Sequence, residues 1–508
     1  MAQRHFYRHY QWVMISFLYF SALCFSVNSY STSSFLESSN IPEIGESSDN
    51  QISSQEYVRL GLVNVLALAR VNGIIQDPLS DFYIQQLGMK ISSSVEFSNE
   101  SDSETYFFIV ASRAINAFAM PGGYIGLNYG LVINSKSEDM LASVIAHELA
   151  HVAKRHLLSA KEEASKNSGL LIAGIIAGLL ASASSKTTNS SIGNALLFGS
   201  LGASAEKQLS FSRKQEEESD LLGLQYLSRS GYDPKGMLEF HELLASLTSG
   251  SQVPEYLSTH PNSGTRIAEI ALRTGHQTSA NIPVTIRHTW FPYIKVRLHA
   301  LDDLKEIALP QENESLNSFE LYSIAMWHQR NKNYAKSNLF YEKTIATDPD
   351  NEYLLYSQAE NYYDQKEFSK AISILKRLVS LYPYFTPARI LLAQNYIETK
   401  DTINFCSTVE YAALPTSSKR VIYLRDQMVF KLRADCSLVK GKILEYHLLL
   451  ANSILASGNI QGAYQQLKLA LRIKNSNENE KVIIHKQLQL LHELDPENIP
   501  QIKTEKGQ

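Results

Sequence analysis

The sequence Val144-Ile-Ala-His-Glu-Leu-Ala-His151 decides the fold of the first half of the chain, because it sets an H-E-x-x-H motif in an apolar, helix-favouring run. On a helix, residues four apart lie on one face, one turn apart. His147 and His151 can therefore reach a single zinc ion. Glu148 flanks the metal position without having to ligate it, which is where a general base for a metal-activated water belongs. The spacing predicts two zinc ligands and a catalytic base.

The bulk composition is that of an ordinary globular protein large enough for two or more domains. The chain has 508 residues, of which 44% are hydrophobic and 19% charged, and its formal net charge is −4. This balance gives no electrostatic case for nucleic acid, and the sequence has no basic stripe. We therefore expect no nucleic-acid partner.

The first residues have the features of a secretion signal. Arg4 and Arg8 precede an apolar run from Trp12 to Val27, and small residues follow it. The run has the length of a signal core and is short for a membrane span. We predict a cleaved signal peptide over residues 1–29, with an uncleaved anchor as the alternative. Residues 30–54, which are rich in Ser and Asn, are predicted to form a flexible leader.

Residues 55–302 are predicted to form the zinc metalloprotease domain, mostly helical with a small sheet. Tyr106–Ala111 has the aromatic and β-branched content of a strand. Asn116–Ile125 is predicted to form strand, turn and strand, with Pro121-Gly-Gly123 as the turn. Helical patterns surround this zone, so the expected fold class of the domain is α+β.

A third protein ligand is expected from the acidic run at residues 216–220, which leads into a helical pattern. Glu216 and Asp220 are four residues apart and share a helix face, whereas Glu218 is about 200° round from Glu216. Ser219 and Gly223 are small and lie on or beside that face, which allows another helix to approach closely. We therefore choose Glu216 as the ligand and Asp220 as the acceptor for the N–H of a zinc-bound histidine. The alternative is a solvated acidic run at a helix start.

Two further histidines need an interpretation. His156 is nine residues from His147, so on a continuous helix it points about 180° away, and we expect a surface residue that is not a ligand. His260 lies in Leu257-Ser-Thr-His-Pro261 near the end of the predicted domain. A His-Pro in a loop is usually a turn, but this histidine could reach the metal. Arg266 and His260 are the candidates for stabilising an oxyanion.

The apolar run Leu170–Ala183 is too short to span a bilayer comfortably. We interpret it as a buried helix or a cover of the active site. The alternative is a hairpin in peripheral contact with a membrane.

Two cysteines, Cys406 and Cys436, remain once the predicted signal peptide has been removed. In an oxidising compartment they could form a disulfide. Two separate buried thiols are the alternative, because connectivity cannot be read from sequence.

From Asn317 the chain repeats with a period of 34 residues. The repeated positions include Ala325, Ala359 and Ala393, and prolines that end successive units, Pro349 and Pro383. This is the pattern of tetratricopeptide helix pairs. We predict a linker over residues 303–316, an all-α tetratricopeptide-repeat solenoid over 317–500 and a tail over 501–508. Such a solenoid has a concave face that binds peptides or proteins.

Four segments together resemble the zinc peptidase family that includes HtpX and the CAAX prenyl endoproteases. They are Asn116–Tyr124, His147–His151, Ser212–Asp220 and Thr259–Pro261. In that family the ligands are the two motif histidines and the first Glu of an E-x-E-A-D motif, a position that falls on Glu216. Here Ser219 replaces the usual Ala, a small-for-small change. The resemblance implies a zincin-like (gluzincin) domain with one Zn²⁺ per chain.

The resemblance also implies roles for residues outside the motif helix. The strand of Asn116, Ala117, Phe118, Ala119 and Met120 would pair with an extended substrate. His260 would fill the fourth zinc position and hold the enzyme latent. The resemblance to family members with similar repeats implies a periplasmic enzyme that is peripheral to the outer membrane. It also implies that the repeats contact outer-membrane β-barrel proteins and their assembly machinery.

We therefore predict a periplasmic zinc metalloendopeptidase that degrades misassembled outer-membrane β-barrel proteins and, like a chaperone, assists their assembly. Hydrolysis would depend on Glu148 and latency on His260. The alternative is a repeat-based chaperone or adaptor with a largely silent zinc site. A third hypothesis, an integral membrane protease, requires both the N-terminus and residues 170–183 to cross the bilayer.

Overall fold

The computed structural model describes residues 53–97, 103–157, 212–248, 254–261, 263–275, 290–302, 316–410, 427–473 and 477–501. The predicted signal peptide, nearly all of the leader and the run 170–183 lie outside the described residues. The chain from Ser53 onward forms one compact unit. Within the described residues, no helix has the length and apolar character needed to cross a membrane.

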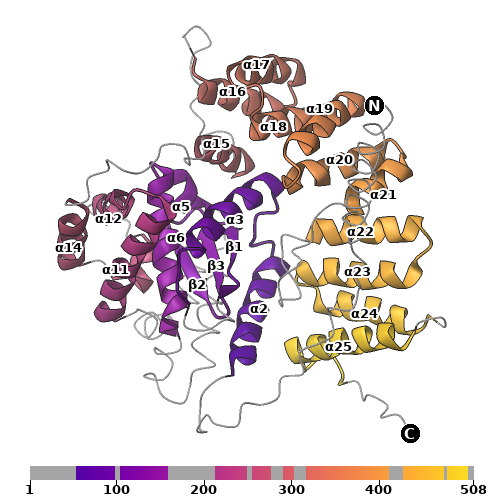
Figure 1. The fold of residues 1–508 in the computed structure, drawn as a ribbon, viewed down its shortest axis with the longest axis horizontal. Helices are drawn as coiled ribbons and strands as arrows, with labels where there is room; N and C mark the ends of the chain where they lie inside the picture. The colour runs from indigo at the N-terminus through magenta and orange to yellow at the C-terminus, as the bar shows by residue number, and fades with distance from the viewer. Residues whose placement is uncertain are drawn as a thin grey trace, which may run out of the picture. The chain divides into compact units, whose positions relative to one another are not determined.

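The small sheet predicted from sequence has three strands in the order β1-β3-β2 (Figure 1). β1 (Tyr106–Val110) runs parallel to β3 (Tyr124–Asn128), and β2 (Ala117–Met120) pairs antiparallel with β3. Gly122 and Gly123 in the turn between β2 and β3 have φ angles of 77° and 75°, a left-handed conformation that favours glycine. The strand, turn and strand prediction is confirmed.

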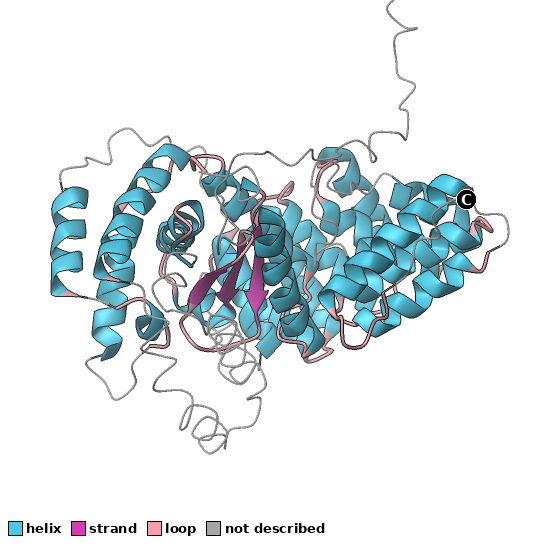
Figure 2. Cartoon of the chain, turned by 90° about the horizontal axis from the view of Figure 1, so that it is seen from below, coloured by secondary structure: helices cyan, strands magenta, loops and turns pink. Residues whose placement is uncertain are grey.

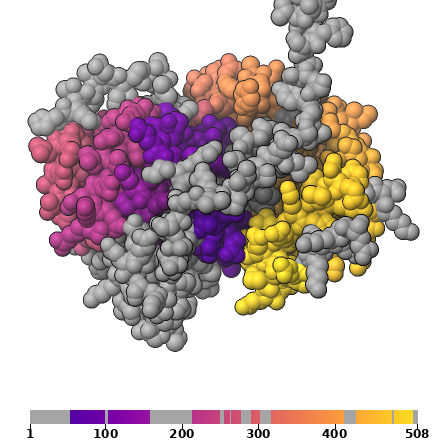
Figure 3. All heavy atoms as spheres, turned by 60° about the horizontal axis from the view of Figure 1, so that its bottom comes forward, coloured from indigo at the N-terminus to yellow at the C-terminus, as the bar shows by residue number. Residues whose placement is uncertain are grey.

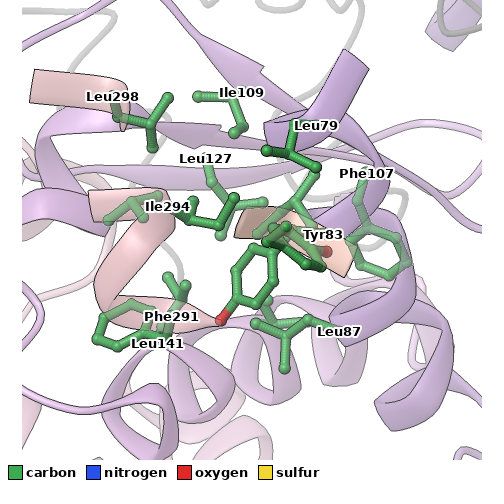
Figure 4. Packing of buried hydrophobic residues seen from close by; sticks show 14 of the residues in the cluster. Leu79, Tyr83, Leu87, Phe107, Ile109, Leu127, Leu141, Phe291, Ile294 and Leu298 are labelled. Carbon is green, nitrogen blue, oxygen red and sulfur yellow. The ribbon is translucent and has the colours of Figure 1, made fainter. Parts of the chain in front are cut away.

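Alternate residues of β1 enter two different hydrophobic cores, because successive side chains of a strand point to opposite faces. Phe107 and Ile109 join the first core, with α3 (Pro78–Ser92) and α6 (Glu138–Ala153). Figure 4 shows these two side chains among Leu79, Tyr83, Leu87 and Leu127. Tyr106, Phe108 and Val110 join the second core. Helices therefore lie on both sides of the strands (Figure 2).

The second core joins distant parts of the chain. It brings the sheet together with α2 (Ser54–Arg70) and with side chains between Ala451 and Ile499. A Cβ atom on Gly458 would lie 2.2 Å from the Leu66 carbonyl oxygen in α2, so the close approach requires glycine there. The C-terminal helices and α2 lie side by side in Figure 3.

The α6 helix is positioned by a cap at its start and by burial along its length. The Ser137 hydroxyl accepts the Met140 N–H at 3.1 Å, and Glu138 and Asp139 lie in the first turn, where the helix dipole favours acidic groups. Every residue from Met140 to Ala153 is buried. The zinc motif is therefore held on a fixed, water-excluded element.

Further helices lie among the described residues between 129 and 302. They are α5 (Tyr129–Asn134), α11 (Arg213–Ser230), α12 (Lys235–Thr248), α13 (Tyr256–Thr259), α14 (Gly264–Gly275) and α15 (Phe291–Asp302). Of these, α11 and α12 pack directly on α6. A capping box of Ser212 and Gln215 starts α11. A Cβ atom on Gly223 would lie 3.4 Å from the His147 backbone nitrogen. The predicted close approach of the small face of this helix to the motif helix is confirmed.

Successive helices form the second region, which comprises the described residues from 316 onward. They are α16 (Ser318–Arg330), α17 (Tyr334–Thr347), α18 (Glu352–Asp364), α19 (Phe368–Leu381), α20 (Thr386–Glu398), α21 (Thr402–Glu410), α22 (Gln427–Val439), α23 (Ile443–Ala456), α24 (Ile460–Leu471) and α25 (Glu478–Leu494). Lys332, Lys366 and Lys400 follow α16, α18 and α20 with φ angles of 58°, 63° and 58°. The same turn therefore recurs at the 34-residue period seen in the sequence.

Two further contacts fix the second region. Arg297 of α15 is buried between Asp77, 2.6 Å away, and Glu360 of α18, 2.7 Å away. Cys406 of α21 and Cys436 of α22 form a disulfide with a Cα–Cα distance of 5.2 Å. The structure thus selects the paired alternative for these cysteines.

Candidate metal centre and active site

Four side chains from three elements converge on one point. His147 and His151 come from α6, Glu216 from the first turn of α11, and His260 from the end of α13. One nitrogen or oxygen atom from each lies within 4.8 Å of all the others, and all four side chains are buried. The predicted ligands and the predicted fourth group are therefore brought together.

The distances between these atoms suit a zinc ion. A tetrahedral ion with ligand bonds of about 2.0–2.1 Å places its ligand atoms about 3.3 Å apart. Nε2 of His147 lies 3.0 Å from Nε2 of His151 and 3.4 Å from Nδ1 of His260. Oε1 of Glu216 lies 3.3 Å from Nε2 of His151 and 3.0 Å from Nδ1 of His260. Three imidazoles and one carboxylate are also the donor types that zinc prefers.

Glu216 remains ionised at this centre. Burial alone would raise the pKa of its carboxyl group, but the imidazole of His260, together with those of His151 and His147, holds that pKa well below its usual range. A metal ligand must be deprotonated. The carboxylate is therefore already in the form that binds a cation.

Asp220 lies behind the first motif histidine, as predicted. Its Oδ1 is 3.0 Å from Nδ1 of His147, whose Nε2 faces the metal position. Burial would raise the pKa of Asp220, but hydrogen bonds from His147 and Arg266 lower it. An ionised Asp220 accepts the His147 N–H and so fixes which nitrogen is free to bind the metal.

Arg266 of α14 forms ion pairs with two carboxylates of the site. Its guanidinium is buried, donates two hydrogen bonds to Asp220 at 2.7 and 2.8 Å, and lies 2.6 Å from Oε2 of Glu216. These contacts hold its guanidinium against two carboxylates and so do not favour Arg266 among the candidates for stabilising an oxyanion. Its pairing with these carboxylates could not be predicted from the sequence, because nothing local connects Arg266 with a residue 46 positions earlier.

Glu148 lies between the metal position and the edge of the sheet. Burial raises the pKa of its carboxyl group, while the imidazoles of His260 and His147 and the backbone amide of Ala119 oppose that rise. A raised pKa brings a carboxyl group closer to the range of an efficient proton carrier. The contact with Ala119 also places the carboxylate next to β2.

β2 directs backbone groups of two of its residues outward, away from β3, on this side. The Asn128 N–H donates to the Asn116 carbonyl at 3.0 Å, so Asn116 belongs to a hydrogen-bonded pair of the antiparallel ladder. Hydrogen-bonded and non-hydrogen-bonded pairs alternate in such a ladder, so Ala117 and Ala119 direct their N–H and C=O groups away from β3. The opposite edge of the sheet is covered, because Ile75 donates to Ile109 there. Among the described residues, β2 is thus the edge of the sheet that no further strand pairs with.

His156 was expected at the surface, and that expectation is wrong. The residue is buried, and its Nδ1 lies 3.1 Å from Nδ1 of His151 and 3.3 Å from Oγ of Ser219. A continuous helix would direct His156 to the surface, but α6 ends at Ala153 and Arg155 adopts a left-handed conformation with φ 51°. This turn brings His156 back beside the motif.

The fold and the donor set define a metallopeptidase, because an H-E-x-x-H helix and a glutamate from a second helix converge beside the predicted base and the edge strand β2. The chain belongs to peptidase family M48, whose model matches residues 78–274. It is a metalloendopeptidase, and the resemblance seen in its sequence is confirmed.

Three relatives show how far the similarity extends. The "Beta-barrel assembly-enhancing protease" of Escherichia coli K12 is 30% identical over 343 residues, which cover 66% of this chain and 69% of that protein. A "Putative beta-barrel assembly-enhancing protease" of Vibrio cholerae is 28% identical, covering 68% and 64%. The "Mitochondrial metalloendopeptidase OMA1" of Arabidopsis thaliana is 32% identical over 185 residues, covering 36% and 35%. The match to the first two therefore extends well beyond the peptidase region.

Proposed function

We propose that this chain is a periplasmic zinc endopeptidase that degrades misassembled outer-membrane β-barrel proteins and assists the assembly of others. The observation that carries the peptidase part is the convergence of His147, His151, Glu216 and His260 beside Glu148 and the open edge of β2. The client class and the periplasmic location rest on the names of the bacterial relatives and on the signal-like N-terminus.

Zinc would be held by His147, His151 and Glu216, with His260 as a fourth ligand in the resting enzyme. When bound, the ion would polarise the scissile carbonyl and acidify a water molecule. Glu148 would take the proton of that water and pass it to the leaving amine. Asp220 would keep His147 in the correct tautomer throughout.

Substrate positioning falls to β2. An extended peptide would add to the sheet at the outward backbone groups of Ala117 and Ala119, in the manner of β-strand addition. The Asn116 amide donates to the Glu255 carboxylate at 3.1 Å and so links this end of the edge strand to the loop that carries His260. The segment Asn116–Met120 is therefore proposed as the substrate-pairing strand.

The helical region would supply the client surface. The recurring turns at Lys332, Lys366 and Lys400 and the 34-residue sequence period support an assignment as tetratricopeptide repeats. We propose repeats over 317–500, a linker over 303–316 and the peptidase region over 55–302. The repeats would bind β-barrel clients and components of their assembly machinery.

The deciding experiment is a degradation assay with a misassembled outer-membrane β-barrel protein. The full chain should degrade it in a zinc-dependent way. Glu148→Gln should keep stoichiometric zinc and lose cleavage by at least about 10²-fold, the contribution of a positioned acid–base group. Glu217→Gln, a change at an exposed position of α11, serves as the matched control. Metal-dependent cleavage that persists in Glu148→Gln would refute the assignment of the base.

One observation favours the second candidate, a chaperone or adaptor whose zinc site is mostly silent. His260 lies where a water or substrate oxygen would have to bind. Rescue of a deletion strain distinguishes the two functions. If Glu148→Gln restores β-barrel assembly as fully as the unchanged chain, binding is the main activity. If Glu148→Gln fails to restore assembly although its zinc content is normal, proteolysis is the main activity.

A further inference from the structure

The second motif histidine has a neighbour that the proposed mechanism does not yet use. Nε2 of His151 faces the metal position, 3.0 Å from Nε2 of His147, while its Nδ1 faces Nδ1 of His156 at 3.1 Å. His156 and His151 are both buried. The contact is therefore shielded from water and directed at the outer side of a predicted ligand.

The tautomers of the two rings follow from metal binding. A neutral imidazole that binds a metal through Nε2 carries its proton on Nδ1. His151 must then donate Nδ1–H, and Nδ1 of His156 must accept it. Because a neutral ring has one N–H, the proton of His156 lies on Nε2.

A carboxylate stands on the far side of His156. Oε2 of Glu218 lies 3.5 Å from Nε2 of His156, and Oε1 of the same group lies 3.2 Å from the Lys154 ammonium. The Ser219 hydroxyl lies 3.3 Å from Nδ1 of His156, the nitrogen whose single lone pair accepts the His151 N–H. Glu218 thus faces away from the metal, as its helical position predicts, and contacts the one nitrogen of His156 that carries a proton.

We propose that His156 is a positioning residue that orients the zinc ligand His151, and that Glu218 fixes the tautomer of His156. The inference rests on the zinc site proposed above. Each motif histidine then has its own outer acceptor: Asp220 contacts His147 directly, whereas Glu218 reaches His151 through His156. Glu218, the third glutamate of the acidic run, thereby gains a role distinct from that of the ligand Glu216.

The test is the zinc affinity of the full chain, measured by competition with a chromophoric chelator. His156→Ala should weaken zinc binding by about 10- to 100-fold, the usual effect of losing an outer acceptor. His156→Asn keeps an acceptor oxygen at the Nδ1 position and should retain affinity close to that of the unchanged chain. His156→Gln moves its polar end to the Nε2 position and should bind as weakly as His156→Ala. Absorption bands of the cobalt-substituted protein should shift in His156→Ala and not in His156→Asn.

Glutamate variants supply the second arm. Glu218→Gln should weaken zinc binding several-fold, whereas Glu217→Gln, an exposed neighbour on the same helix turn, should leave it unchanged. Equal thermal unfolding of the zinc-free variants would show that folding is preserved. Equal affinities of all His156 variants, or equal losses in Asn and Ala, would overturn the proposal. An unchanged chain that binds no stoichiometric zinc would instead refute the metal site itself.

Discussion

Nε2 of His260 lies 3.5 Å from Oε1 of Glu148, the predicted general base. The other ring nitrogen, Nδ1, lies 3.0 Å from Oε1 of Glu216. The ring also stacks on Tyr256, with 4.4 Å between centroids and an interplanar angle of 17°. One imidazole therefore covers the fourth metal position and the base together, so its departure would expose both at once.

Removing this imidazole should activate the enzyme. We expect His260→Ala to raise turnover of an unfolded β-barrel client by roughly tenfold, as for release from a contact worth about 1.4 kcal/mol. The measurement is client cleavage and self-cleavage by purified protein at matched zinc content. His485→Ala in α25 is the control. Unchanged turnover in the His260 variant would contradict the latency proposal.

Arg266 should be essential for folding of the site. It neutralises Asp220 and Glu216 in a buried position, so Arg266→Met leaves both carboxylates without their cation. Breaking a buried ion pair in this way costs about 3–5 kcal/mol. Denaturant unfolding measures the loss. The control is Arg273→Met in the same helix, whose exposed pair with Glu269 contributes at most about 1 kcal/mol. Similar losses in both variants would argue against the role given to Arg266.

Stability should depend on pH through Glu138, at the start of α6. This carboxylate accepts hydrogen bonds from Tyr83 and Tyr232 at 2.9 and 3.1 Å, and burial raises its pKa from 4.5 to about 7. The folded state then binds more protons than the unfolded state between these values. Stability from this group is therefore present at low pH and is lost as the pH rises from 4.5 to 7.

Glu138→Gln removes that titration and should flatten the profile. The free energy of unfolding of the variant relative to the unchanged chain should rise between pH 4.5 and 7, by up to about 3 kcal/mol. Chemical denaturation at several pH values measures the difference. A constant difference across this range would show that Glu138 does not titrate there.

The disulfide should stabilise the α21–α22 region. Cys406 and Cys436 are 30 residues apart, and closing a loop of this length restricts the unfolded chain by about 3–4 kcal/mol. Reductant should therefore lower the Tm of the unchanged chain. The double variant Cys406→Ser, Cys436→Ser should start lower and not respond to reductant. Equal unfolding with and without reductant would show that the bond contributes nothing.

The convergence of His147, His151 and Glu216 could be predicted because it follows from helix geometry. The i and i+4 spacing fixed His147 and His151, and the shared face of Glu216 and Asp220 separated the ligand from its neighbours. The prediction for His156 was wrong because it extended the same helix geometry beyond Ala153, where α6 ends. The end of α6 could not be predicted from the residue types. Helices often end at a glycine in the left-handed conformation, but here an arginine, Arg155, adopts it.

Long-range packing was beyond sequence reasoning. β1 is aromatic and β-branched throughout, which identifies a strand with two buried faces but not what covers each. The first face meets α3 and α6, and the second meets helices more than three hundred residues later. The ion pair of Arg266 with Asp220 could not be predicted either, because only folding brings these residues of α14 and α11 together.

The second core has a consequence for folding during synthesis, because it joins the sheet to the last helices of the chain. A chain that emerges N-terminus first presents all of its catalytic groups before residues 451–499 are available to cover Tyr106, Phe108 and Val110. Until then this face of the sheet has only α2 of its two covering elements, and intermediates that expose apolar surface are prone to aggregate. A product that ends before residue 451 would therefore lack the side chains that the last helices contribute to the cover of Tyr106, Phe108 and Val110.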